Sequence, residues 1–198
     1  MLTNDITFWV GIIGSLILVT GAGWPGEKEH TAPTKSTKNW LFAIGGLAML
    51  AYAILNSMYH QAPFFFVIFE IFMAITSVLM MLDTDDKLDT IIVSIAATVF
   101  IIWSLYLFEG YTTIIFIIGL CVTGLGFAFE MGSRRRDIAL TIGSATIAIF
   151  SFIASSWIFF WLNAFFAVFS GYYLYKSLTK PTPKPTKRIH RIHRRNKK

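Results

Sequence analysis

Charged residues are scarce in this sequence. Asp, Glu, Lys and Arg make up 14% of its 198 residues, and 55% of the residues are hydrophobic. A typical soluble domain has about 25% charged residues. A chain with so little charge cannot easily cover a soluble globule with polar side chains. We therefore expect most of it to lie in a lipid bilayer.

Residues that build metal sites and catalytic clusters are also few. Cys121 is the single cysteine and lies in an apolar run, which excludes an internal disulfide framework. The four histidines lie outside the apolar runs, and no cluster has the spacing of metal ligands or of a nucleophile with its base. We therefore expect no enzyme, no metal and no cofactor. No lysine lies inside an apolar run, which also excludes a retinal Schiff base there.

Seven apolar runs, each near the length of a membrane crossing, occupy most of the chain. Only helices satisfy their own backbone polar groups in lipid, so we expect an all-α integral membrane protein with seven transmembrane helices. They would form one domain over residues 1–176, followed by a basic disordered tail at 177–198. The first run has no preceding basic residues and no cleavage site, so we interpret it as a retained span. The runs cover residues 6–22, 40–57, 63–82, 90–108, 111–129, 138–153 and 158–175.

The basic residues predict the orientation. If the seven runs alternate in direction, all seventeen Lys and Arg residues fall on one side of the membrane. The positive-inside rule then places the N-terminus outside and the C-terminus in the cytoplasm, in the inner (plasma) membrane. The basic tail is expected to contact anionic lipid, at about 1 kcal/mol for each basic residue near the surface. We expect no nucleic-acid partner.

The first three runs resemble the last three. An Ile-Ile-Gly triplet ending at Gly14 recurs at Gly119, 105 residues later, and an Ile-Gly pair ending at Gly45 recurs at Gly143, 98 residues later. This predicts two parallel three-helix repeats, at 6–82 and 111–175, joined by a linker helix at 90–108. Three helices are an odd number, so the linker is what allows both repeats to insert in the same direction.

This 3+1+3 arrangement with an outside N-terminus resembles the PQ-loop superfamily. That superfamily includes the SWEET sugar transporters and the PnuC-type nicotinamide riboside transporters. The last run, WLNAFFAVFSGYYLY, contains Asn163 and ends with Gly171 and two tyrosines, and is similar to the third helix of those repeats. The chain has no Pro-Gln pair. The resemblance covers about residues 6–176 and implies a substrate site between parallel repeats near the membrane midplane.

Glu70 is the only acid well inside an apolar run. A carboxylate in hydrocarbon costs about 3 kcal/mol, so we expect it to face protein or a wet cavity. Removal from water also favours its protonated form. One interpretation is a substrate-binding or proton-coupling group, and the other is a structural hydrogen bond to a neighbouring helix. Extending the offset of 98 places Glu70 near Val168 and not opposite Asn163.

The other candidate residues each have two interpretations. The side chain of Asn163 binds substrate or joins two helices. The aromatic candidates stack on substrate or belong to the interfacial belt: they are Trp103, Trp161 and Tyr172. The glycine candidates allow close helix packing or serve as a hinge: they are Gly45, Gly46 and Gly143.

These patterns predict a transporter of a small hydrophilic metabolite, sugar-like or vitamin-like, that is either facilitative or proton-linked. The alternative is a non-transporting membrane scaffold or accessory subunit, in which Glu70 bonds across a partner interface. A polar cavity that is open to one side and contains Glu70 and Asn163 would favour the transporter. The expected partners are the small-molecule substrate and the bilayer, and the chain could also form a homo-oligomer.

Overall fold

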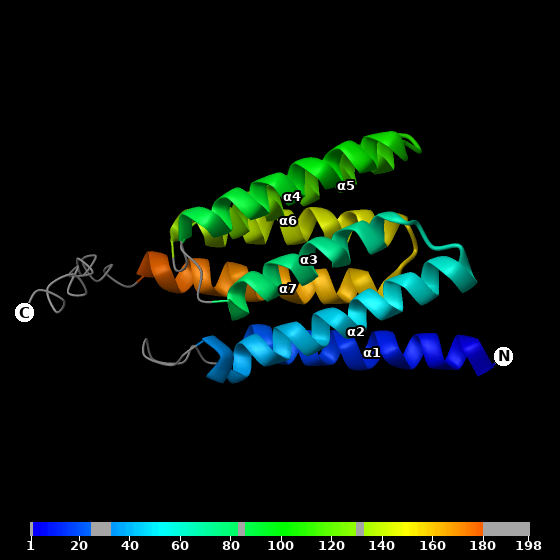
Figure 1. Cartoon of the computed structure of the whole chain (residues 1–198), viewed down its shortest axis with the longest axis horizontal. Coiled ribbons are helices and arrows are strands. Elements are labelled where there is room, and N and C mark those ends of the chain that lie inside the picture. Colours follow the sequence, from blue (N-terminus) through cyan, green and yellow to red (C-terminus); the bar gives the residue numbers. More distant parts are fainter. Residues whose placement is uncertain (1, 25–32, 83–85, 130–132, 180–198) are drawn as a thin grey trace, which may run out of the picture.

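The computed structural model describes residues 2–24, 33–82, 86–129 and 133–179. Within these ranges the chain is all-helical, with seven α-helices and one short 3₁₀ helix (Figure 1). The elements are α1 (Leu2–Gly23), η1 (Pro33–Lys35), α2 (Thr37–His60), α3 (Phe65–Met81), α4 (Asp86–Tyr106), α5 (Tyr111–Ala128), α6 (Arg134–Ile153) and α7 (Trp157–Thr179).

Six of these helices are long and apolar enough to cross a membrane. The exception is α3, an apolar helix of 17 residues, which spans about 26 Å at 1.5 Å per residue. It still packs between α2 and α4, and its two ends lie at opposite ends of the bundle (Figure 1). The chain is thus a multi-pass membrane protein. The residues beyond Thr179, which include most of the predicted tail, lie outside the described ranges.

The helices extend past the apolar runs because polar residues cap them. The Ser36 side chain accepts a hydrogen bond from the backbone N–H of Asn39, and Ser133 accepts one from the N–H of Arg136. Each cap satisfies one of the unpaired N–H groups of a helix start. As a result α2 and α6 each begin with a polar first turn that carries basic residues.

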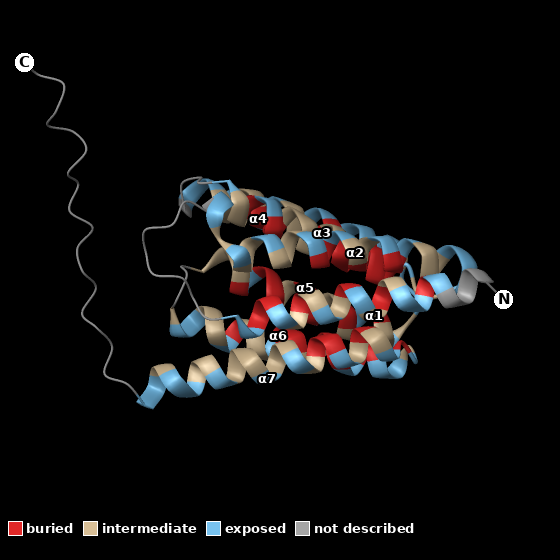
Figure 2. Cartoon of the chain, turned by 90° about the horizontal axis from the view of Figure 1, so that it is seen from below, coloured by how far each residue is buried: buried red, intermediate tan, exposed pale blue. Residues whose placement is uncertain are grey.

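The helices form a ring. Each helix contacts its neighbours in sequence, and α1 contacts α7 to close the ring. A further contact joins α3 to α5, so α4 covers these two helices from outside. We call α1–α3 the first triplet and α5–α7 the second. In each triplet the middle helix packs against the other two. Buried residues face the interior of the bundle, and exposed residues cover its outside (Figure 2).

The two ends of the bundle differ in charge. The described Lys and Arg residues all lie at the end that holds η1, the starts of α2, α4 and α6 and the end of α7. We call this the basic end. The links from α2 to α3, α4 to α5 and α6 to α7 lie at the opposite end (Figure 1).

Glycines set the close packing within each triplet. A Cβ added at Gly45 would lie 3.0 Å from the backbone N of Leu18, and one at Gly143 would lie 2.7 Å from the backbone N of Thr123. Gly45 and Gly143 are 98 positions apart, and their contacts Leu18 and Thr123 are 105 positions apart. These are the two spacings found in the sequence. The α1–α2 and α5–α6 pairs therefore share this close approach.

Candidate functional site

A cavity of about 690 Å³ lies inside the ring of helices. Residues of α1, α2, α3, α5, α6 and α7 line it, and α4 contributes none. Its deepest polar side chains are buried, with Glu70 1% and Asn163 4% exposed. At the basic end, Lys38 and Arg136 are half-buried and Lys176 is exposed. The cavity therefore opens toward the basic end.

The cavity is long and narrow. On α7 its lining runs from Leu162 to Ser177, which corresponds to about 22 Å at 1.5 Å per residue. Glu70 lies in the second turn of α3 and Asn163 in the second turn of α7, so both lie nearer the opposite end. We call the lining at the basic end the mouth, formed by Lys38, Asn39, Arg136, Asp137, Tyr173, Lys176 and Ser177.

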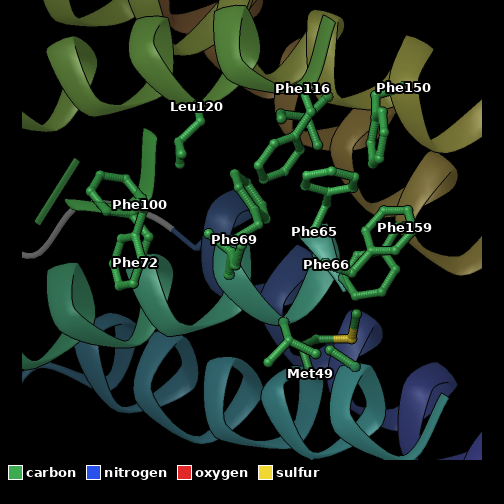
Figure 3. Close-up of a cluster of buried hydrophobic side chains, with 14 of the residues drawn as sticks. Met49, Phe65, Phe66, Phe69, Phe72, Phe100, Phe116, Leu120, Phe150 and Phe159 are labelled. Carbon is green, nitrogen blue, oxygen red and sulfur yellow. The ribbon is translucent and has the colours of Figure 1, made fainter. Parts of the chain in front are cut away.

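Tightly packed aromatic rings close the opposite end, one turn beyond Glu70 and Asn163. Phe66 of α3 and Phe159 of α7 stack with ring centroids 4.2 Å apart and planes 7° apart. Tyr52 packs on Phe159 at 5.4 Å, and Phe150 packs on Phe66 at 5.3 Å. Figure 3 shows these phenylalanines gathered where the two triplets meet. We call this group the aromatic plug: Tyr52, Phe65, Phe66, Phe116, Phe150 and Phe159.

Three buried side-chain oxygen atoms have no hydrogen-bond partner among the described residues, and two of them belong to the cavity lining. These two are Glu70 Oε2 and Thr123 Oγ1. The Asn163 Nδ2 group, by contrast, donates to the carbonyl oxygen of Phe159 at 2.9 Å. A buried polar atom without a partner costs about 1–3 kcal/mol. Water or a polar ligand in the cavity would relieve that cost.

The cavity lining recurs between the two triplets at fixed spacings. The spacing is 105 residues between α1 and α5, 98 between α2 and α6, and 93 between α3 and α7. Every lining residue of the first triplet has a lining counterpart in the second. The pairs are Leu18 and Thr123, Ala22 and Phe127, Lys38 and Arg136, Asn39 and Asp137, Phe42 and Leu140, Gly46 and Ser144, Phe69 and Leu162, Glu70 and Asn163, Met73 and Phe166, Ser77 and Ser170, and Met80 and Tyr173.

At the spacing of 93 the position that matches Glu70 in the lining is Asn163, whereas the spacing of 98 used in the sequence prediction leads to Val168. Val168 is 66% exposed and does not line the cavity. The cause is a shorter path through the opposite end of the second triplet. Because α2 ends at His60, a spacing of 98 would place the end of α6 at residue 158. The helix α6 ends instead at Ile153, and α7 begins at Trp157. The loss of five positions changes the spacing from 98 to 93.

The aromatic plug follows the same spacings. Phe66 and Phe159 are 93 residues apart, and Tyr52 and Phe150 are 98 residues apart. The contact of Tyr52 with Phe159 and the contact of Phe150 with Phe66 are therefore counterparts, and their centroid distances differ by only 0.1 Å. Both contacts cross from one triplet to the other.

The three aromatic candidates predicted from the sequence do not line the cavity. Trp161 is 56% and Tyr172 is 57% exposed, and Trp103 belongs to α4, which contributes no residue to the lining. These positions do not support stacking on a ligand in the cavity. Tyr173 lines the mouth instead: its OH donates to the carbonyl oxygen of Ala22 at 3.5 Å.

The three glycine candidates divide into two groups. Gly45 and Gly143 lie in helix contacts, as described above. Gly46 lines the cavity, and the nearest atom to an added Cβ is Ser77 Oγ at 3.8 Å. The structure places the first two in packing, whereas a hinge role stays a prediction.

Comparison with protein-family models, curated proteins and solved structures found no match to this chain. The resemblance to the PQ-loop superfamily thus stays a prediction from architecture and pattern. Among the described residues, no group of three or more His, Cys, Asp or Glu side chains could hold a metal ion. The mouth residues Lys38 and Arg136 were missed from the sequence, although their spacing of 98 was a usable signal.

Proposed function

We propose that this protein is a membrane transporter that moves a small hydrophilic metabolite through the central cavity by alternating access. The observation that carries the proposal is the cavity itself. It lies between two helix triplets, opens at one end and reaches a buried carboxyl group and a buried amide. Substrate sites of transporters built from repeats typically lie at such an interface.

The proposed architecture is two parallel three-helix repeats joined by α4, with α3 as a seventh span. The recurrence of the lining residues and of the plug contacts supports this relation. A two-fold axis along the bundle would pass close to the Phe66–Phe159 stack, because these two residues are counterparts. The basic end would face the cytoplasm, as the positive-inside rule requires.

The contacts that cross between the triplets are the ones that alternating access would break and re-form. Opening the opposite end requires Phe66 and Phe159 to separate, and an aromatic pair contributes about 0.5–1.5 kcal/mol beyond its buried area. Closing the basic end requires the mouth to narrow, where Tyr173 already bonds to Ala22 across the α1–α7 contact. Alternating access therefore also requires that the apolar area buried by these rings be covered again in the other state.

The cavity also favours a transporter over a scaffold. A scaffold buries Glu70 against a partner helix, where the carboxyl group has a hydrogen-bond partner. In this fold Glu70 lines the central cavity and is 1% exposed, so its carboxyl group does not reach an outer face of the bundle where a partner helix would bind. The cavity contains Glu70 and Asn163 and opens at one end, as expected of a transporter, whereas apolar side chains make up most of the rest of its lining.

The test is solute uptake into proteoliposomes, with labelled glucose, sucrose and nicotinamide riboside as probes. Ser77→Trp should fill the cavity, because Ser77 is buried and lines it. Val78→Trp is the matched control, since Val78 is the next residue of α3 and is 56% exposed. We expect uptake of at least one probe, reduced at least tenfold by Ser77→Trp and retained by Val78→Trp.

Size-exclusion chromatography should confirm that both variants fold. Uptake unaffected by Ser77→Trp would exclude the cavity as the path. No uptake of any probe by folded, correctly inserted protein would favour the scaffold.

A further inference from the structure

The mouth of the cavity brings together cations from three helices. Lys38 comes from the first turn of α2, Arg136 from the first turn of α6 and Lys176 from the last turn of α7. Lys38 and Arg136 are counterparts at the spacing of 98, and both line the cavity. The described carboxylate at the mouth is Asp137, which interacts electrostatically with Arg136. The described mouth therefore has an excess of positive charge.

Aromatic rings of the cavity wall hold both cations in place. The Lys38 Nζ atom lies 5.8 Å from the ring centroid of Tyr173, and the Arg136 guanidinium carbon lies 5.7 Å from that of Phe127. Tyr173 and Phe127 themselves line the cavity. Cation–π contacts of this kind fix a cation while leaving its N–H groups able to donate.

The two cations also interact unfavourably with each other. Lys38 and Arg136 repel each other electrostatically. Both residues are half-buried, so water only partly screens this repulsion. Both lie in the first turns of helices, where the helix dipole favours an anion. An anionic group between them would offset the repulsion and accept their hydrogen bonds.

We propose that the mouth is a binding site for a phosphate group, carried by a soluble phosphomonoester or by the headgroup of an anionic lipid. Lys38 and Arg136 bind the phosphate oxygens, one from each triplet, and Lys176 adds a third charge. Phosphate suits this arrangement because it presents several acceptor oxygens to separate donors. The site rests on the proposed function and deepens it, because a cluster of cations at the mouth attracts a phosphorylated substrate toward the cavity.

The test is equilibrium binding to purified full-length protein in phosphatidylcholine nanodiscs, measured by calorimetry at fixed ionic strength. Glycerol 3-phosphate is the probe and glycerol its neutral control. Lys38→Gln and Arg136→Gln remove one cation each. Lys87→Gln is the matched control, because Lys87 is exposed at the same end but belongs to α4, which does not line the cavity.

We expect glycerol 3-phosphate to bind and glycerol not to bind. Each of Lys38→Gln and Arg136→Gln should weaken binding about tenfold, the usual effect of losing a hydrogen bond to a charged group. Lys87→Gln should change the Kd less than twofold. Equal weakening by all three variants would show a general surface potential and overturn the site.

A second arm separates the two phosphate sources. Nanodiscs that contain phosphatidylglycerol replace the soluble probe with a lipid headgroup, and lipid retention is measured by native mass spectrometry. Retention lost in Lys38→Gln and Arg136→Gln but kept in Lys87→Gln assigns the site to lipid. Failure of both arms overturns the proposal. Uptake of a neutral solute does not depend on this binding, so the proposed transport would stand or fall separately.

Discussion

Replacing Gly143 by alanine should separate α5 from α6. A Cβ at this position would lie 2.7 Å from the backbone N and 3.0 Å from the Cα of Thr123, and it would also contact the Thr123 hydroxyl. The hydroxyl can rotate away, but the backbone of α5 cannot. The two helices must then move apart by several tenths of an ångström, which disturbs the packing of Gly119 on Ile147. Overpacking of this kind costs about 1–3 kcal/mol.

Gly46→Ala is the matched control. Gly46 lies in the middle of α2, and the nearest atom to an added Cβ is 3.8 Å away. Both substitutions gain about 1 kcal/mol in helix propensity. The difference in unfolding free energy between the two variants therefore isolates the steric cost. We expect Gly143→Ala to be the less stable of the two by about 1–3 kcal/mol.

The assay is reversible unfolding in mixed micelles by increasing SDS, followed by the fluorescence of the six tryptophans. Circular dichroism should confirm that both variants begin with the same helix content. Equal unfolding free energies for Gly143→Ala and Gly46→Ala would refute the close approach of α5 and α6.

Two further predictions concern coupling and topology. Glu70→Gln keeps the shape and the hydrogen bonding of the side chain but cannot release a proton. Uptake by this variant should therefore lose its pH dependence while the amount of protein in the membrane stays normal. Unchanged pH-dependent uptake would exclude proton coupling by Glu70. If the group is structural instead, Glu70→Gln should be silent in uptake, and Glu70→Ala should lower stability by about 1–2 kcal/mol. Reporter fusions at Gly110 and after Lys198 should lie on opposite sides of the membrane, whereas the same side would contradict seven spans.

The helices could be predicted from the sequence because long apolar runs leave the backbone no other way to pair in lipid. Their ends could be predicted less well. Capping by Ser36 and Ser133 extends α2 and α6 into polar sequence. The start of α3 at Phe65 rather than at residue 63 shortens that helix. Hydropathy reports where lipid lies, whereas caps and links determine where a helix ends.

Glu70 and Asn163 could be identified because a polar residue stands out in an apolar run. The aromatic candidates could not, since α7 is apolar on nearly all sides and its sequence does not indicate which face is internal. Adjacent residues of a helix point about 100° apart. Tyr173 therefore lines the mouth, whereas Tyr172 lies outside it.

The spacing of 93 between matching residues of α3 and α7 depends on the length of the link between α6 and α7. The spacings of 105 and 98 could be read from glycine pairs because glycines mark close approaches of helix backbones. No glycine pair marks α3 and α7. The match of Glu70 to Asn163 needed the three-dimensional position of the α6–α7 link, which local sequence does not encode.

The pairing of Glu70 with Asn163 sets a limit on energy coupling. A carboxyl group can release a proton and an amide cannot, so the deep part of the described cavity offers one proton site where a strictly symmetric pair would offer two. Proton-linked transport through it would then have a stoichiometry of at most one proton per substrate. A pH difference of one unit supplies about 1.4 kcal/mol, and a membrane potential of 100 mV supplies about 2.3 kcal/mol per charge. Together they would allow an uncharged solute to accumulate about five-hundredfold, because each 1.4 kcal/mol corresponds to a factor of ten.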